Sequence, residues 1–162
     1  MRDADRPSFE EWARARQQYL VRSAYLLTGD FQRAEDLVQE ALVRAAMRWD
    51  SLREGSPDAW VRTVVYREHV SWWRRRRREV LVDEVPEPAA YDAPVLTDAA
   101  LVTALAQLTW SQRAVLLLRF AEDLSVAETA EVLAVSDGTV KRQTSVALAR
   151  LRALGADLVE ER

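Results

Sequence analysis

The chain has no cysteine and only one histidine, His69, among its 162 residues. Disulfides, thiolate nucleophiles and metal clusters built on cysteine or histidine are therefore excluded. Glycine is scarce, with 4 residues, and neither GxxxxGK[ST] nor GxGxxG occurs, so no phosphate-binding loop is visible. No apolar run approaches the roughly 18 residues of a membrane span, and the N-terminus lacks a signal-peptide core. These absences argue against most catalysis and predict a cytoplasmic protein without metal, cofactor or membrane partner.

Apolar residues instead recur with a helical period, and no strand-like alternation is found. Helices are predicted over roughly 9–28, 31–49, 57–78, 99–108, 110–120, 126–133 and 137–154. Segment 83–98 breaks this pattern because it is acidic and contains three of the 5 prolines. We therefore predict an all-α chain of two small helical domains, 1–84 and 99–162, joined by a flexible linker over 85–98.

Capping signals mark most of these helices. S-x-x-E or T-x-x-Q capping boxes begin at Ser8, Thr109 and Ser125, and single caps are expected at Asp30, Ser56 and Ser136. Gly29 and Gly155 are expected to end the helices that precede them. Asp50–Gly55 reads as a polar loop.

Residues 125–152 have the pattern of a helix-turn-helix, with a short helix, a three-residue turn and a longer helix. Ala130 is small where the helices cross, and Val135 and Val140 are apolar where they face inward. The second helix would present side chains that reach phosphates and base edges in a major groove. These are Asp137, Thr139, Lys141, Arg142, Gln143, Thr144 and Ser145. The pattern favours DNA binding over an ordinary αα-corner with a solvated face.

Five consecutive arginines, 74–78, follow the pair Trp72 and Trp73. A solvated helix end explains one or two arginines, whereas five at this density indicate an anionic partner. Neighbours on a helix lie about 100° apart, so both tryptophans cannot face one core. We expect Trp73 to pack inward and Trp72 to be exposed, where its indole could stack on an unpaired base. The alternatives are a second packing surface or a contact with the linker.

The net charge of −3 is unusual for a DNA-binding protein. Basic residues are concentrated at 74–78 and 141–142, and neither predicted domain is basic on average. Because few phosphates could be neutralised, the isolated chain should bind DNA weakly. DNA recognition would then depend on a larger assembly.

Three stretches, read together, resemble the extracytoplasmic-function (group IV) sigma factors of bacterial RNA polymerase. They are AEDLVQEALVRAAMRWD (34–50), AWVRTVVYREHVSWWRRRRRE (59–79) and LTWSQRAVLLLRFAEDLSVAETAEVLAVSDGTVKRQTSVALARLR (108–152). They occur in the family's order, and the SWWRRRRR ending is similar to that of a small subgroup.

The resemblance implies a role for each part. Residues 1–84 would be the sigma region 2 domain, which binds core polymerase and the −10 element. Residues 99–162 would be the region 4 domain, whose last helix reads the −35 element and whose other face packs on the β flap. The acidic linker would thread the active-site and RNA-exit region.

Site residues are carried over position by position. From the residue pattern alone, the charged face of helix 31–49 is predicted to be a solvated surface with a Glu40–Arg44 pair. The resemblance instead makes it the surface that docks on the β′ clamp helices, through Asp36, Leu37, Gln39, Glu40 and Val43. The candidates for capturing and reading the melted −10 element are Arg53, Trp60, Arg62, Arg67, Ser71, Trp72, Trp73, Arg74 and Arg75. The −35 candidates are the seven polar residues at 137–145 given above.

The chain departs from the family pattern at several positions. Thr109-Trp110 stands where proline is usual, and the capping box can replace that helix start. Ala134 stands where the turn usually has glycine, and a left-handed alanine costs roughly 1 kcal/mol. Val146 stands where arginine is frequent, which removes a phosphate contact that Arg142 could replace.

The implied function is that of an alternative sigma factor that binds core RNA polymerase and directs initiation at promoters, without being an enzyme. The short stretch after the helix-turn-helix predicts no appended sensory domain, so we expect control by an anti-sigma factor or by expression level. One alternative is a stand-alone helix-turn-helix regulator, although no dimerisation helix is evident. Another is a polymerase-binding decoy, which Ala134 and Val146 would allow.

Overall fold

The computed structural model describes residues 1–80 and 99–160, with side chains described over 1–76 and 99–155. Those residues form helices and turns with no strand among them, which confirms the predicted all-α class. The elements are η1 (Asp3–Asp5), α1 (Arg6–Thr28), α2 (Phe31–Met47), α3 (Trp49–Leu52), α4 (Pro57–Val80), α5 (Ala99–Ala106), α6 (Trp110–Leu116), the π-helical turn η2 (Leu117–Ala121), α7 (Val126–Leu133) and α8 (Asp137–Glu160). The predicted linker, 85–98, lies outside the described residues.

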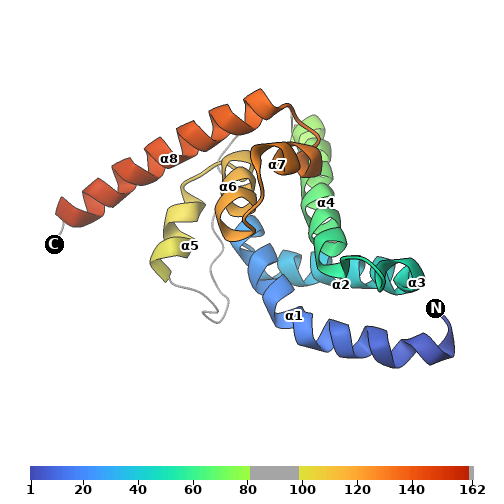
Figure 1. The fold of residues 1–162 in the computed structure, drawn as a ribbon. Coiled ribbons are helices and arrows are strands. Elements are labelled where there is room, and N and C mark those ends of the chain that lie inside the picture. The colour runs from blue at the N-terminus through green and yellow to red at the C-terminus, as the bar shows by residue number, and fades with distance from the viewer. Residues whose placement is uncertain (81–98, 161–162) are drawn as a thin grey trace.

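Helices α1, α2 and α4 pack on one another and form the first half of the molecule (Figure 1). The apolar residues that recur with a helical period in α2 are buried, and Val38, Ala41 and Ala45 are each 0% exposed. Leu27 of α1 and Val61 of α4 are also 0% exposed and complete this core. The helical spacing of the apolar residues therefore identified the packed face of α2 correctly.

Local capping signals place the ends of these helices. The Asp30 carboxylate accepts a hydrogen bond from the backbone N–H of Arg33 at 3.1 Å, and Ser56 Oγ accepts one from that of Ala59 at 3.4 Å. Gly29 ends α1 in the left-handed conformation, with φ of 70°. All three predictions are confirmed, because caps act within a few residues of sequence.

The expected capping box at Ser8 is wrong. Helix α1 already begins at Arg6, with Pro7 in its first turn, so Ser8 lies inside the helix. Proline is well suited to a first turn because its fixed φ is helical and its missing N–H is not needed there. The proline, rather than the serine, marks this helix start.

The boundary after α2 also differs from the prediction. Helix α2 ends at Met47, since Arg48 adopts φ of −118° and ψ of 15°, and the expected loop begins as the short helix α3. This break turns the Trp49 ring into the core, where it is 3% exposed and its centroid lies 5.3 Å from that of Trp12. The packing of Trp49 against α1 therefore accompanies the end of α2 at Met47, where the sequence predicts that the helix continues.

In the second half, the capping boxes predicted at Thr109 and Ser125 both form. In each box, the cap side chain accepts from the backbone N–H three residues on, and the side chain of that residue accepts from the backbone N–H of the cap. Thr109 and Gln112 cap α6, and Ser125 and Glu128 cap α7. The hydrogen bonds from Ser125, its backbone N–H first, lower the pKa of Glu128. The Thr109 box confirms that this helix can start without proline.

Two details of the second half differ from expectation. The predicted helix 110–120 ends in the π-helical turn η2, which inserts an extra residue, since the Glu122 N–H donates to the Leu117 carbonyl at 2.9 Å, and Phe120 in this turn is 59% exposed. Gly155 does not end α8, which continues to Glu160. A glycine inside a helix costs only about 1 kcal/mol, so it does not force a stop.

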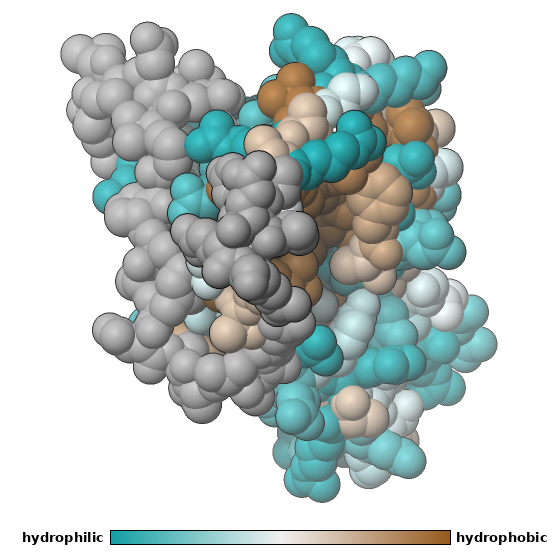
Figure 2. Space-filling view, turned by 90° about the vertical axis from the view of Figure 1, so that its left-hand side faces the viewer, coloured by the Kyte–Doolittle hydropathy of each residue, from teal (hydrophilic) through white to brown (hydrophobic). Residues whose placement is uncertain are grey.

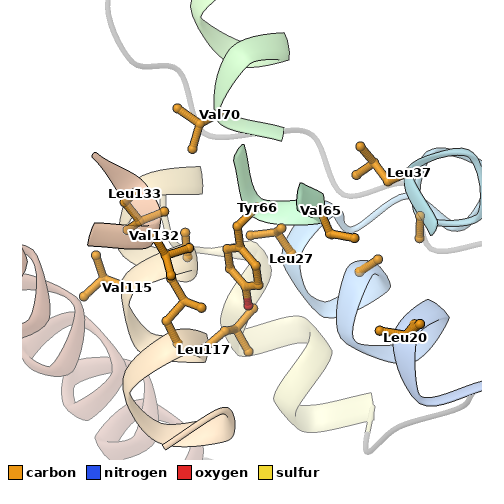
Figure 3. Close-up of a cluster of buried hydrophobic side chains, with 14 of the residues drawn as sticks. Leu20, Leu27, Leu37, Val65, Tyr66, Val70, Val115, Leu117, Val132 and Leu133 are labelled. Atoms are coloured by element: carbon orange, nitrogen blue, oxygen red, sulfur yellow. The ribbon is translucent and has the colours of Figure 1, made fainter. Parts of the chain in front are cut away.

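The two halves share one apolar core (Figure 3). Tyr66 of α4 is 2% exposed, and its ring lies among Leu27 of α1, Leu117 of η2 and Val132 of α7. Burial raises the pKa of Tyr66. Contacts of α4 with α7 and of α1 with α6 dock the halves together, as Figure 1 also shows.

The surface is mixed in character. Seen from the side where α5 and the end of α8 lie, apolar atoms gather near the middle of the face, with hydrophilic atoms above and below them (Figure 2). Among the described residues, Leu101 of α5 and Val146 of α8 are large apolar side chains that are 44% and 47% exposed. No helix in the described part of the chain is both long and apolar enough to cross a membrane.

Candidate functional site

The outer face of α2 carries most of the predicted polymerase-binding residues. Asp36, Gln39, Glu40 and Val43 are all exposed there. Leu37 is 5% exposed and belongs to the core, so the structure does not bring it to this face. It lies about 100° around the helix from Asp36. Val43 and Met47, which are 59% and 76% exposed, give this acidic face an apolar centre.

Arg44 links this face to α4. Its guanidinium lies 2.6 Å from the Glu40 carboxylate, which confirms the predicted i,i+4 pair, and 2.9 Å from that of Glu68 on α4. The hydrogen bond to Glu68 is the main reason that the pKa of Arg44 is raised. Because Arg44 and Glu40 are about half exposed, the pair is worth at most about 1 kcal/mol, and its main effect is to orient Glu40.

Arg53, the −10 candidate before α4, is held by the N-terminus. Its guanidinium forms an ion pair with Asp5 and another with Glu54 at 3.4 Å. The Asp5 side chain is 7% exposed, so η1 is fixed against this turn. Sequence patterns gave no sign of this pair, whose members are 48 residues apart.

The remaining −10 candidates do not form one exposed surface. Arg67, Arg74 and Arg75 are exposed, whereas Trp60 and Ser71 are half-buried. Arg62 and Arg67 point toward the second half of the molecule, as described below. Helix α4 therefore divides its candidate DNA contacts between solvent and internal packing.

The tryptophan pair is covered more fully than expected. Trp72 is half-buried: the Arg33 guanidinium carbon lies 3.8 Å from its ring centroid and that of Arg76 lies 5.0 Å away. The prediction of an uncovered indole is wrong, because cation–π contacts already occupy this ring. Trp73 packs inward as predicted and stacks on Trp110 of α6, with centroids 6.3 Å apart and an interplanar angle of 7°.

His69 lies at the centre of these aromatic rings and is 1% exposed. Trp73 Nε1 lies 3.1 Å from its Nε2, and Arg33 Nε lies 3.4 Å from its Nδ1. Burial, followed by the charges of Arg33 and Arg113, lowers the pKa of His69 well below 6.5. A neutral imidazole has one acceptor nitrogen and a protonated one has none. His69 is therefore a neutral packing residue at pH 7.

The helix-turn-helix forms as predicted from α7, the turn and α8. Ala134 ends α7 in the left-handed conformation, with φ of 55° and ψ of 48°. Val140 and Ala147 of α8 are both 0% exposed and pack inward. The predicted alanine strain is therefore present, and the turn still brings α8 into position.

The seven −35 candidates are not equally accessible. Asp137, Lys141, Arg142 and Ser145 are exposed, whereas Thr139, Gln143 and Thr144 are half-buried. Thr144 Oγ1 donates to the Val140 carbonyl at 2.7 Å, and Thr139 Oγ1 lies 2.9 Å from Ser136 Oγ. The threonine hydroxyls are thus used within the helix.

Polar contacts of Arg67 and of Glu122 cross between the halves. Arg67 donates to the backbone carbonyls of Val132 at 3.3 Å and Glu131 at 3.2 Å, in the last turn of α7, where a helix attracts cations. The Glu122 carboxylate accepts a hydrogen bond from Tyr19 Oη at 2.9 Å and lies 3.5 Å from the Arg62 guanidinium. Sequence reasoning missed Glu122, since its partners are far away in the chain.

A cavity of 290 Å³ lies between the end of α4 and the helix-turn-helix. Trp73 and Arg74 line it from α4, Trp110 from α6, and Arg142 and Gln143 from α8. None of its lining residues is acidic. It therefore joins candidates for −10 and −35 recognition across one basic space.

Comparison with known proteins agrees with this architecture. Residues 12–79 match the model of sigma-70 region 2, and residues 98–151 match that of sigma-70 region 4. The chain is 41% identical over 148 residues to the RNA polymerase sigma-E factor of Streptomyces coelicolor, covering 89% of this chain and 84% of that protein. It is 30% identical over 153 residues to the ECF RNA polymerase sigma factor SigM of Mycobacterium tuberculosis, covering 93% and 78%.

A solved structure gives the same result. The sigma factor RpoE of Bartonella quintana, crystallised with the anti-sigma factor NepR, is 31% identical, with a TM-score of 0.66 over 91% of this chain and 96% of that one. A helical chain that matches both regions in order is a sigma factor of the sigma-70 type. Within that class it belongs to the extracytoplasmic-function family and is an alternative sigma factor that directs transcription initiation. The resemblance inferred from the sequence is confirmed at this level.

Proposed function

We propose that this sigma factor docks on the β′ clamp helices of core RNA polymerase through the outer face of α2, defined by Asp36, Gln39, Glu40 and Val43. The observation that carries the proposal is the exposure of Val43 and Met47 between carboxylates on an otherwise well-packed helix. An apolar centre surrounded by a polar rim is typical of protein–protein interfaces, and the carboxylates would select a basic partner surface. The region 4 domain would pack on the β flap.

We further propose that the exposed arginines at the end of α4 and the tryptophans beside them bind the melted −10 element. Cations and aromatic rings together hold unpaired bases. Asp137, Lys141, Arg142 and Ser145 would contact the −35 element in the major groove. The proposed domain limits are 1–84 and 99–162, with the linker between them, and the SWWRRRRR subgroup is part of this proposal.

The chain itself would perform no chemistry, since its one histidine is a packing residue and the polymerase supplies the active site. An anti-sigma factor is a proposed partner. Its support is that a sigma factor 31% identical to this chain was crystallised with the anti-sigma factor NepR.

The direct experiment is co-migration of the purified chain with core polymerase in gel filtration. We expect the double charge reversal Asp36→Lys/Glu40→Lys to weaken this association at least tenfold and to abolish run-off transcription. The matched control is Glu10→Lys/Glu11→Lys, which reverses two exposed charges on α1. Association that survives the α2 reversal unchanged would refute this docking surface.

The same assays separate the alternatives. A stand-alone regulator would bind duplex promoter DNA tightly without polymerase. A decoy would co-migrate with polymerase but give no transcript on any promoter.

A further inference from the structure

The 290 Å³ cavity between the end of α4 and the helix-turn-helix is apolar in its depth and cationic where it meets solvent. Val70, Val115 and Leu133, from α4, α6 and α7, line it and are buried, so they form its floor (Figure 3). Arg74 and Arg142 also line it and are exposed. A ligand that matches this cavity would therefore have an apolar body and an anionic end.

One wall of the cavity is aromatic. Trp73 and Trp110 both line it, and their rings are nearly parallel, with an interplanar angle of 7°. A flat heteroaromatic ring gains free energy by stacking on such a wall, as nucleic-acid bases do. The Gln143 side-chain amide lines the same space and has no hydrogen bond within the described part of the chain. Its oxygen and its NH₂ group can therefore pair with the polar edge of a heteroaromatic ring.

The two arginines of this cavity have no carboxylate beside them. In the 210 Å³ cavity between α1 and α4, by contrast, the Arg62 guanidinium lies 3.5 Å from the Glu122 carboxylate. Arg74 and Arg142 form no ion pair with any of the described residues, and no acidic residue lines their cavity. Their charge is left for an external anion, and guanidinium groups bind phosphate through paired N–H donors.

We propose that this cavity binds a free purine nucleoside 5′-phosphate, with its base on the tryptophan wall and its phosphate at Arg74 and Arg142. The hydroxyl groups of Ser111 and Thr139 line the space between and would face the sugar. Small-molecule sites usually measure about 300–1,000 Å³, so this volume suits one nucleotide. The bound nucleotide would compete with promoter DNA for the two arginines, although the site itself does not depend on the proposed promoter contacts.

Isothermal titration calorimetry on the full chain, without DNA or polymerase, tests the site directly. We expect GMP and AMP each to bind one to one with a Kd of about 0.1 mM. Guanosine lacks the phosphate and inorganic phosphate lacks the base, so each should bind about tenfold more weakly or worse, because charge-assisted hydrogen bonds and stacking both contribute.

Two pairs of variants locate the ligand. Ser111→Leu fills part of the cavity from α6 and should weaken GMP binding about tenfold, whereas Ser111→Ala removes only a hydroxyl group and should change it by less than about threefold. Arg142→Gln should weaken GMP binding about tenfold and leave guanosine binding unchanged. The matched control is Lys141→Gln, which removes an exposed cation of α8 that does not line the cavity and should leave both affinities unchanged.

The proposal is overturned if neither nucleotide binds saturably below about 1 mM. It is also overturned if Ser111→Leu, folded by circular dichroism, binds GMP as tightly as the unsubstituted chain. Equal affinities of Arg142→Gln and Lys141→Gln for GMP would overturn it as well, and this pair carries the test alone should Ser111→Leu not fold. Loss of polymerase co-migration by the unsubstituted chain would instead refute the proposed function, because that measurement contains no nucleotide.

Discussion

The end of α4 and the start of α8 are both proposed to read DNA, but they are held very differently. On α4, the Trp72 ring is covered by Arg33, Trp73 stacks on Trp110, and Arg67 is bound to the end of α7. On α8, Lys141, Arg142 and Ser145 lie exposed on one face. The tryptophans of α4 are part of the internal packing, whereas these residues of α8 lie on the surface.

This difference indicates which promoter contacts cost free energy to form. Base capture by α4 must compete with existing stacking and hydrogen bonds, each worth about 0.5–1.5 kcal/mol. Groove contacts by α8 displace only water and counterions. Binding through α4 should thus be sensitive to mutations in the second half, whereas contacts of α8 should be sensitive mainly to salt.

Removal of Trp110 should have the largest effect, because this ring supports α4 from the other half. Trp110→Ala should lower the free energy of unfolding by about 3 kcal/mol, through lost burial and a cavity. The matched control is Phe120→Ala, an aromatic that is 59% exposed in the same half, which should cost less than about 0.5 kcal/mol. Urea unfolding measures both, and equal costs would show that the stack on Trp73 does not support the core.

Acidification should be the next largest effect, and near neutral pH it acts on the α4 cluster through His69. The pKa of His69 is lowered in the folded state, so the unfolded chain binds more protons. Stability should be constant above about pH 6.5 and should fall below it, by up to about 1.4 kcal/mol per pH unit. Protonation would also leave His69 with no acceptor for Trp73 or Arg33 and would place a cation between Arg33 and Arg113.

Urea unfolding from pH 8 to pH 5 tests this expectation. His69→Gln keeps an acceptor for the Trp73 indole but cannot titrate, so its stability should fall less steeply with acid. Parallel pH profiles for the two proteins would show that other groups control the acid response.

The sequence predicted best what short-range chemistry decides. The caps at Asp30, Thr109 and Ser125 and the turn at Ala134 depend on atoms a few residues apart, and all are confirmed. The burial of the apolar face of α2 followed from the helical period of its apolar residues. The start of α1 and the break at Arg48 were missed because packing against a distant aromatic, or a competing proline, decided the boundary.

The site was predicted less completely, for a physical reason. Residue type and spacing identified which side chains could bind DNA, and the family is confirmed by comparison. They could not reveal that Glu122 would meet Tyr19, or that Arg33 would cover Trp72, because these contacts join residues 103 and 39 positions apart. The docking of the two halves, and not the local sequence pattern, determines which of the candidate DNA-binding side chains are exposed.

A smaller effect on stability is expected at the two helix ends with left-handed backbone, Gly29 in the first half and Ala134 in the second. Ala134→Gly should relieve strain of about 1 kcal/mol and lose part of it to chain entropy, for a net gain of about 0.5 kcal/mol. Gly29→Ala should do the reverse and cost about 1 kcal/mol. Thermal unfolding of both variants measures the signs, and a loss of stability in Ala134→Gly would show that this turn carries no strain.

The smallest effect on stability is expected at Val146, which is 47% exposed on the α8 reader. Val146→Arg should change the free energy of unfolding by less than about 0.5 kcal/mol. It should add one phosphate contact, which steepens the dependence of log affinity on log salt by about 1. Titration of a 30-base-pair duplex between 50 and 200 mM salt measures this slope, with Val146→Leu as the uncharged control. If the two slopes are equal, position 146 does not face the DNA backbone, and the proposed orientation of α8 in the groove must be rotated.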